Sequence, residues 1–157
     1  SDEVAALFDF YEAVAEDLGI DLMAEGHGQV FGDRLMIRRA ISNLLSNALR
    51  HAERNTKVTV AVMTRESEVT LSVSNKGTSI GREHQSRLFD RFYRVDKART
   101  RPESDGAGLG LAITSAIMQA HRGQIDVASE AERTTFSLHF PLPALDASHE
   151  QLRSMGR

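Results

Sequence analysis

Apolar side chains occupy every second position in two neighbouring segments of this chain, residues 58–62 and 69–73. Such an alternation predicts strands that bury one face of a sheet. Only a short polar stretch around Glu66 separates the two segments, so we expect an antiparallel hairpin. A second pair of strands is expected at residues 124–128 and 135–140. Strands that follow one another directly argue against a doubly wound parallel sheet, in which a helix follows each strand.

Elsewhere apolar residues recur at spacings of three and four, which indicates amphipathic helices. We expect a helix over about residues 1–18 and a second from an N-cap at Asp33 to about His51. A third should begin after the glycine-rich residues 106–110 and stop at Gly123. Helices that do not alternate strictly with strands predict an α+β fold. Its architecture would be a two-layer sandwich, with a mixed, largely antiparallel sheet packed on three helices.

The remaining segments complete one domain. Two further short strands are expected at residues 20–23 and 29–31, with glycines between them. A short helical stretch is expected to end at residues 88–93. The domain should span residues 1–143, because a proline ends its last strand, and residues 144–157 should form a polar tail.

Composition excludes several classes of protein. Hydrophobic residues make up 41% of the chain and charged residues 26%, which is typical of a globular domain rather than a disordered or fibrous one. No apolar run approaches the roughly 18 residues of a membrane span, and no signal-peptide pattern opens the chain. The absence of cysteine excludes disulfides and thiolate metal sites. A formal net charge of -3 argues against a nucleic-acid partner.

Three polar residues share one face of the second predicted helix, away from its apolar stripe. Asn43, Asn47 and Arg50 follow one another at spacings i, i+4 and i+7. Asparagine is a modest helix former, so two on one face need a reason. The face is either solvated or the wall of a pocket, where amide oxygens would bind Mg²⁺ and the guanidinium would bind phosphate.

Asn75 ends a row of inward positions in the second strand of the hairpin. Strand parity places it on the same side as Val73, which is the core side. A polar group there needs a hydrogen-bonding partner. Asn75 is either part of an Asx turn that caps the strand or a ligand contact, and Gly77 would let the backbone approach a ligand closely.

Glycines precede the third predicted helix. Gly106, Gly108 and Gly110 would let backbone N–H groups and the positive end of the helix face an anion. The pattern is not a Walker A loop, since no lysine follows at the required place. It is not G-x-G-x-x-G either, since Leu111 stands at the last position. Residues 94–105 lack apolar periodicity and include several basic side chains, so we expect a long functional loop there.

Together these patterns resemble the catalytic, ATP-binding domain of bacterial sensor histidine kinases. Four motifs of that family have counterparts here in the same order and at matching separations. The counterparts are residues 43–51 for the N box, 75–80 for the G1 box, 89–94 for the F box and 106–111 for the G2 box. The resemblance covers about residues 1–143. The stretch 88–96 most resembles the branch of the family that senses heavy metals such as copper.

The resemblance implies the ATP-binding sandwich shared with gyrase, mismatch-repair and heat-shock chaperone ATPases, with ATP and Mg²⁺ as ligands. By position, Asn47 would bind Mg²⁺ beside Asn43. Residues 94–105 would form the ATP lid, anchored by packing of Phe89 and Phe92. The ATP-binding residues implied in this way are Asn43, Asn47, Arg50, His51, Asn75, Gly77, Ile80, Arg94, Gly106, Gly108, Leu109 and Gly110.

Three positions depart from the family's pattern. Asn75 stands where aspartate is usual, so adenine would be recognised through an amide oxygen. Ser79 replaces the second glycine of the G1 box. Arg133 precedes Thr134 where many relatives have glycine, so the resemblance does not support a nucleotide role for Thr134.

The implied reaction is transfer of the γ-phosphoryl group of MgATP to a histidine on a separate dimerisation and phosphoacceptor domain, with a response regulator as the next partner. That domain should lie outside this chain, because His149, in the polar tail, has no pair of helices around it. The chain would then hold no catalytic nucleophile, and would be a protein-histidine kinase only together with the acceptor domain. The resemblance also implies a cytoplasmic domain, monomeric in isolation, of a membrane-anchored protein of the bacterial inner membrane.

Two alternatives to this reaction are open. An ATP-hydrolysing clamp of the gyrase or chaperone type needs a water-activating carboxylate on the N-box helix, and no Asp or Glu lies between Ile37 and Ala52. A non-catalytic nucleotide-binding or interaction module would keep the fold without the reaction. A nucleotide titration would separate an interaction module that binds no nucleotide from the other readings.

Overall fold

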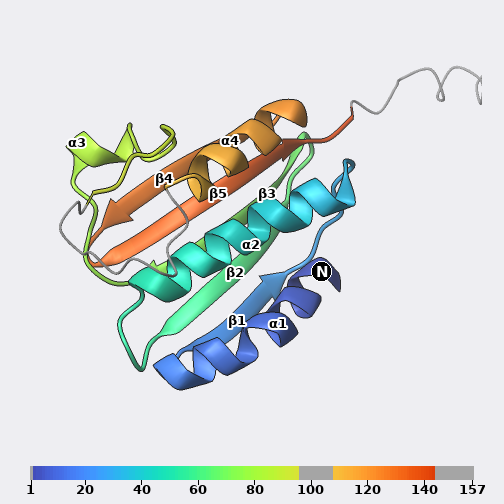
Figure 1. Cartoon of the computed structure of the whole chain (residues 1–157). Helices are drawn as coiled ribbons and strands as arrows, with labels where there is room; N and C mark the ends of the chain where they lie inside the picture. Colours follow the sequence, from blue (N-terminus) through green and yellow to red (C-terminus); the bar gives the residue numbers. More distant parts are fainter. Residues whose placement is uncertain (1, 96–107, 144–157) are drawn as a thin grey trace, which may run out of the picture.

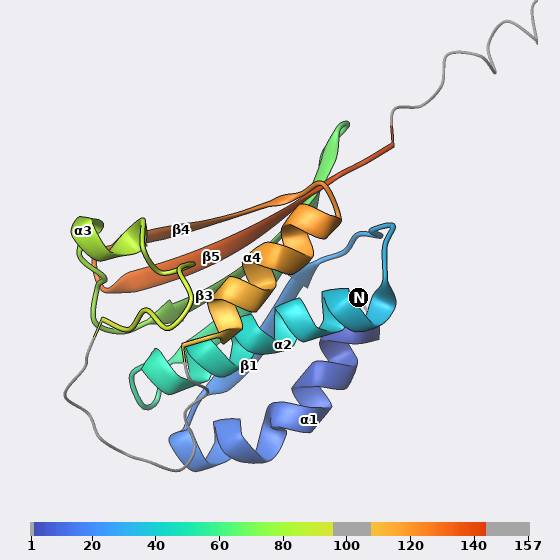
Figure 2. The same cartoon turned by 45° about the horizontal axis from the view of Figure 1, so that its top comes forward.

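A sheet and a layer of helices make up the molecule (Figures 1 and 2). The structure, a computed structural model, describes residues 2–95 and 108–143. Along the described chain the elements are α1 (Asp2–Leu18), β1 (Asp21–Gly26), α2 (Arg34–His51), β2 (Lys57–Thr64), β3 (Glu68–Lys76), α3 (Arg82–Gln85), α4 (Gly110–Ala120), β4 (Gln124–Glu130) and β5 (Arg133–Pro141). The strands form a sheet in the order β1-β2-β3-β5-β4, and α1, α2 and α4 lie over one of its faces. The predicted two-layer α+β sandwich is confirmed.

Strand pairing follows the predicted hairpins. β2 pairs with β3 and β4 with β5, and β3 and β5 join the two hairpins, all in antiparallel pairs. β1 is parallel to β2 at the edge, which makes the sheet mixed. β4 and β5 extend further than predicted, because the turn between them is formed by Ala131 and Glu132, both at positive φ (49° and 61°). Two central residues of this conformation make a tight hairpin turn.

The core lies between the sheet and the helices. Alternate residues of β3 and β5, such as Val73 and Phe136, are buried in one cluster with the apolar stripe of α2, where Leu44 and Leu45 are fully buried. Burying a side chain of this size contributes about 1.5–3 kcal/mol. None of the helices in the described part of the chain is long and apolar enough to cross a membrane.

Polar contacts tie α2 to α4, which run in opposite directions (Figure 1). Asp33 caps α2 as predicted, since its Oδ1 accepts a hydrogen bond from the backbone N–H of Met36 (2.9 Å). The backbone N–H of Asp33 donates to Nε2 of His121 at the end of α4 (3.0 Å). The other ring nitrogen of His121 lies 2.7 Å from the carbonyl oxygen of Ile117. The start of α2 is therefore fixed to the end of α4.

Two local predictions are wrong. Residues 29–31 do not form a strand, and the single strand in that region, β1, ends at Gly26. A φ of 72° at Gly26 turns the chain away from its ladder with β2, so the residues that follow have no strand to pair with. The helical stretch expected before residue 93 is confined to α3, which is followed by turns.

Candidate functional site

A cleft opens at the end of the sheet where β3 ends and β5 begins. Its volume is about 450 Å³, within the range of small-molecule sites. A second cleft of the same volume lies on the open face of the sheet around His139. Volume therefore does not distinguish the two, but the first cleft is lined by residues of the predicted motifs, whereas the second contains none of them and is lined by the carboxylates of Glu25 and Glu68. The predicted residues that line it are Asn43, Asn47, Arg50, His51, Asn75, Ile80, Arg94, Gly108 and Gly110.

The polar face of α2 forms one wall. Asn43, Asn47 and Arg50 all line the cleft, so this face is a pocket wall rather than a fully solvated surface. Asn43 also joins α2 to α4, because its Nδ2 donates to the carbonyl of Gly110 (3.0 Å) and to Oγ1 of Thr114 (3.2 Å). Asn47, one turn further along, is half-buried at the cleft surface.

The start of α4 lies at the cleft. Gly108 and Gly110 line it, and Gly108 has a φ of 70°, a conformation that favours glycine. Leu109, the N-cap, makes no side-chain hydrogen bond, so among the described residues the first N–H groups of α4 have no cap from that position. Such a helix end attracts an anion. Leu109 itself does not line the cleft, and Gly106 lies outside the described residues.

The described residues that flank the predicted lid meet at the cleft. The backbone N–H of Phe92 donates to the carbonyl of Gly108 (3.2 Å), and Arg94 and Val95 line the cleft. The chain therefore leaves and rejoins the described structure at one edge of the cleft. Residues 96–105 of the predicted lid lie outside the described residues.

The expected packing of the two F-box phenylalanines holds for one of them. Phe89 packs edge-to-face on Phe136, with ring centroids 6.3 Å apart. Phe92 is 69% exposed with a φ of 64°, so the prediction that it is a packing residue is wrong. The neighbouring Tyr93 packs instead, with its ring centroid 4.4 Å from the guanidinium of Arg87.

A row of polar side chains crosses the sheet at the cleft. Asn75 on β3, Thr134 on β5 and Ser129 on β4 lie directly opposite one another in the strand pairing, and all three are buried. The next row inward is apolar and includes Val73 and Phe136. Because Asn75, Thr134 and Phe136 line the cleft, this end suits a flat ring with polar atoms on its edge.

Several lining residues were not predicted to bind, and Thr134 is the most informative of them. The departure at Arg133 left its role unsupported, but strand pairing places it beside Asn75. Its position two residues before Phe136 on an inward-facing row was the available signal. The unpredicted lining residues are Ser46, Thr78, Ser79, Leu88, Tyr93, Val95, Leu111, Thr134 and Phe136.

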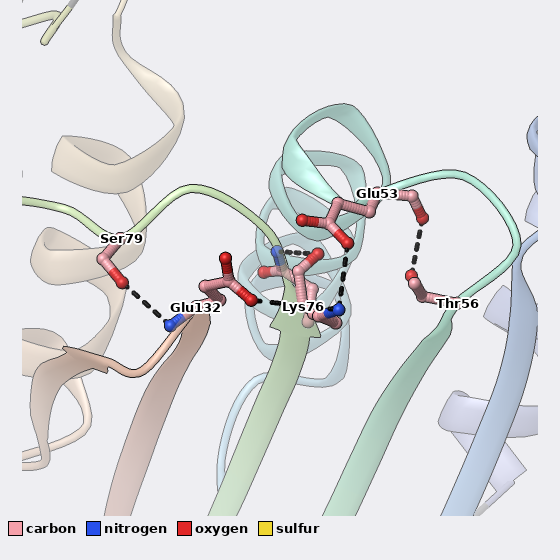
Figure 3. A network of polar contacts seen from close by, with 6 residues as sticks. Glu53, Thr56, Lys76, Ser79 and Glu132 are labelled. Carbon is pink, nitrogen blue, oxygen red and sulfur yellow. Dashed lines mark hydrogen bonds and ion pairs between the residues drawn. The ribbon is translucent and has the colours of Figure 1, made fainter.

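Gly77 does not line the cleft; it lies where the end of β3 meets the end of α2. A Cβ at this position would lie 2.2 Å from the carbonyl oxygen of His51, so the glycine lets the end of β3 approach the end of α2. Ion pairs continue this junction (Figure 3): Nζ of Lys76 lies 3.2 Å from Oε2 of Glu53 and 3.9 Å from Oε2 of Glu132. All three side chains are exposed, so each pair contributes little by itself.

The charges around the cleft suit a polyanion. Arg50, His51 and Arg94 line it, and none of its lining residues in the described chain is Asp or Glu. A metal ion here would be held by neutral oxygens, such as the amide of Asn47, together with oxygens of the anion, a ligand set that fits Mg²⁺. The described residues contain no group of three or more Asp, Glu or His that could hold a metal ion.

The sandwich fold, with an anion-suited cleft between its helices and one end of its sheet, defines an ATPase type of domain. The chain belongs to the family of histidine kinase-, DNA gyrase B-, and HSP90-like ATPases, whose model matches residues 32–144. Within that family it is a domain of the histidine-kinase type, as its relatives show.

The chain is 49% identical over 142 residues to the sensor histidine kinase CusS of Escherichia coli K12, an alignment that covers 90% of this chain and 29% of CusS. It therefore spans less than a third of the length of such relatives. The expected likeness to heavy-metal sensor kinases is confirmed.

Solved structures share the fold. The catalytic domain of histidine kinase ThkA has a TM-score of 0.77 at 24% identity, covering 89% of this chain and 92% of that one. ThkA in complex with response regulator protein TrrA has a TM-score of 0.75 at 21% identity, covering 92% and 41%. The mycobacterial sensor histidine kinase MprB has a TM-score of 0.73 at 26% identity, covering 87% and 94%.

Proposed function

We propose that this domain binds MgATP in the cleft and donates the γ-phosphoryl group to a histidine on a separate dimerisation and phosphoacceptor domain. The observation that carries the proposal is the division of the cleft into two ends. The end at α2 and α4 has cationic side chains and the start of α4; among its described residues it has neither a side-chain cap from Leu109 nor a carboxylate, which suits a triphosphate. The end at β3 and β5 has polar atoms beside apolar side chains, which suits a base.

The residues at the end formed by α2 and α4 would bind the metal and the phosphates. The amide oxygen of Asn47 would hold the metal, while Arg50, His51 and Arg94 contact the phosphates. Bound Mg²⁺ would supply neutralisation of the charge shared by the β- and γ-phosphates. The side chains of this domain then contribute position and charge stabilisation rather than a nucleophile.

The two alternatives differ from the proposal in what the cleft must contain. An ATP-hydrolysing clamp needs a carboxylate that activates water, and none lines the cleft within the described residues, which disfavours it. A non-catalytic nucleotide-binding module needs the same cleft but performs no transfer, so phosphoryl transfer to an acceptor domain distinguishes it.

The partners and location of the whole protein are also proposals, since this chain spans 29% of CusS. We propose a membrane-anchored sensor of the bacterial inner membrane that places this domain, monomeric by itself, in the cytoplasm. A response regulator would receive the phosphoryl group from the acceptor domain. The structure of ThkA with response regulator protein TrrA supports a partner of this class.

Calorimetric titration with ATP, with and without Mg²⁺, tests the first step. The wild-type chain should bind ATP more tightly with Mg²⁺, and Asn47→Ala should lose that gain while keeping its fold. Gln119→Ala, which truncates an exposed amide near the far end of α4, is the control and should bind like the wild type. Undiminished MgATP affinity in Asn47→Ala would remove this residue from the metal site, and a wild-type chain that binds no ATP would refute the proposed function.

A further inference from the structure

Ser129 is 6% exposed and lies beside the cleft without lining it. Its hydroxyl oxygen accepts a hydrogen bond from the backbone N–H of Ile80 (2.8 Å) and lies 2.7 Å from Oγ1 of Thr134. Both of these partners line the cleft, one from the segment after β3 and the other from β5. A single hydroxyl group therefore connects two walls of the cleft.

The bond to Ile80 decides the direction of the bond between the two hydroxyls. The N–H of Ile80 can only donate, so it occupies a lone pair of Ser129, whose own hydrogen still needs an acceptor. Among the described residues, Oγ1 of Thr134 is the acceptor within reach of that hydrogen. Ser129 therefore donates to Thr134. The hydrogen of Thr134 can then point into the cleft, next to Asn75, its partner across the pairing of β3 and β5.

Other contacts keep this arrangement in place. Nε2 of Gln85 donates to the carbonyl of Ile80 (2.8 Å), so both backbone groups of Ile80 are engaged. The backbone N–H of Glu132 donates to Oγ of Ser79 (3.0 Å; Figure 3), which ties the turn between β4 and β5 to the same segment. The oxygen of Ser129 is thus held between two fixed segments.

We propose that Ser129 is a positioning residue that sets the base preference of the cleft, an inference that rests on the proposed nucleotide function. Adenine presents an amino donor beside a ring-nitrogen acceptor, whereas guanine presents a carbonyl acceptor beside a ring N–H donor. The amide of Asn75 can turn to suit either base. A hydroxyl of Thr134 that accepts from Ser129 keeps its hydrogen for the adenine ring nitrogen and has one lone pair fewer to offer the guanine N–H, so it favours adenine. Ser129 thereby gives the cleft a selectivity that Asn75 alone does not supply.

Calorimetric affinities of the full chain for MgATP and MgGTP test this inference. Ser129→Ala lets the Thr134 hydroxyl rotate, so ATP affinity should fall about tenfold, the size of one net hydrogen bond, while GTP affinity stays the same or rises. The matched control is Ser74→Ala, which removes a similar hydroxyl pair between β3 and β5, Ser74 with Thr135 at 2.9 Å, on the opposite face of the sheet. The control should keep the ATP-to-GTP ratio of the wild type.

The outcomes separate the inference from the function on which it rests. Equal losses for both nucleotides, or an unchanged ratio, in Ser129→Ala would overturn the inference alone. If Ser129→Ala does not fold, Thr134→Val decides the matter, because it removes the same donor while keeping the bond from Ile80 to Ser129; its ATP-to-GTP ratio must fall. A wild-type chain that binds no MgATP would overturn the proposed function and the inference with it.

Discussion

Asn75 is 4% exposed, yet the hydrogen bond from its Nδ2 to the carbonyl of Lys76 is long, at 3.4 Å. A buried amide with so weak an internal partner is suited to bind a group in the cleft. We predict that Asn75→Ala weakens ATP binding about ten- to a hundredfold, because a buried polar group left unpaired costs about 1–3 kcal/mol. Asn75→Asp should widen the ATP-to-GTP preference, since a carboxylate accepts from the adenine amino group and repels the guanine carbonyl. Competition binding of both nucleotides to the three proteins measures this, and unchanged ATP affinity in Asn75→Ala would exclude the residue from the base site.

The polar row across the sheet contains one residue that was predictable from the sequence and two that were not predicted. Asn75 was predictable, because an amide at the end of an alternating apolar row is locally unusual. Ser129 and Thr134 were not predicted, because the predicted strands stopped at residue 128 and resumed at residue 135, although Thr134 shares its strand parity with Phe136. The turn that sets the true strand ends adopts positive φ without glycine or asparagine, so no local signal marked it.

At the scale of elements, α2 and α4 together form the side of the cleft that we propose binds the phosphates. Asn43 contacts Gly110 at the cleft end, and Asp33 contacts His121 at the far end. These contacts join residues 67 and 88 positions apart, so a single sequence does not reveal them. The helices themselves were predictable from their apolar stripes and from the N-cap of α2, which are local features. The prediction of a strand at residues 29–31 was wrong, because a strand also needs a neighbouring strand to pair with, which a local pattern does not reveal.

The link between these two helices can be separated from ligand binding. Asn43→Ala removes the donor that Gly110 and the fully buried Thr114 share, so we expect a loss of about 1–2 kcal/mol in the free energy of unfolding. For a domain of this size, the unfolding midpoint would fall by roughly 2–8 °C. Asn47→Ala, one turn away, removes no such contact among the described residues and should stay within about 2 °C of the wild type. Scanning calorimetry without nucleotide compares the three proteins, and equal midpoints would show that Asn43 does not hold the helices together.

At the scale of the whole molecule, the position of the histidines bears on whether the chain can act alone. Of the histidines in the described residues, His51 is the one that lines the cleft, and it does so from the α2 wall beside Arg50. An acceptor must approach the transferred phosphorus opposite the leaving oxygen, whereas we expect a wall residue to contact the phosphates from the side. His149 lies outside the described residues. An acceptor on a separate domain is therefore the arrangement that the cleft favours.

We predict that the isolated chain acquires no phosphate from γ-labelled ATP, and that adding the two-helix phosphoacceptor domain of its own parent protein produces acid-labile label on that domain. Asn47→Ala should abolish the labelling, because the metal would no longer be held against the phosphates. Ser74→Ala, on the opposite face of the sheet from the cleft, should preserve it. Acid-labile phosphate on the isolated chain would contradict the prediction, and peptide mapping would then show whether His51 or His149 accepted it. If the chain binds MgATP but never labels the added domain, the non-catalytic nucleotide-binding module becomes the better description.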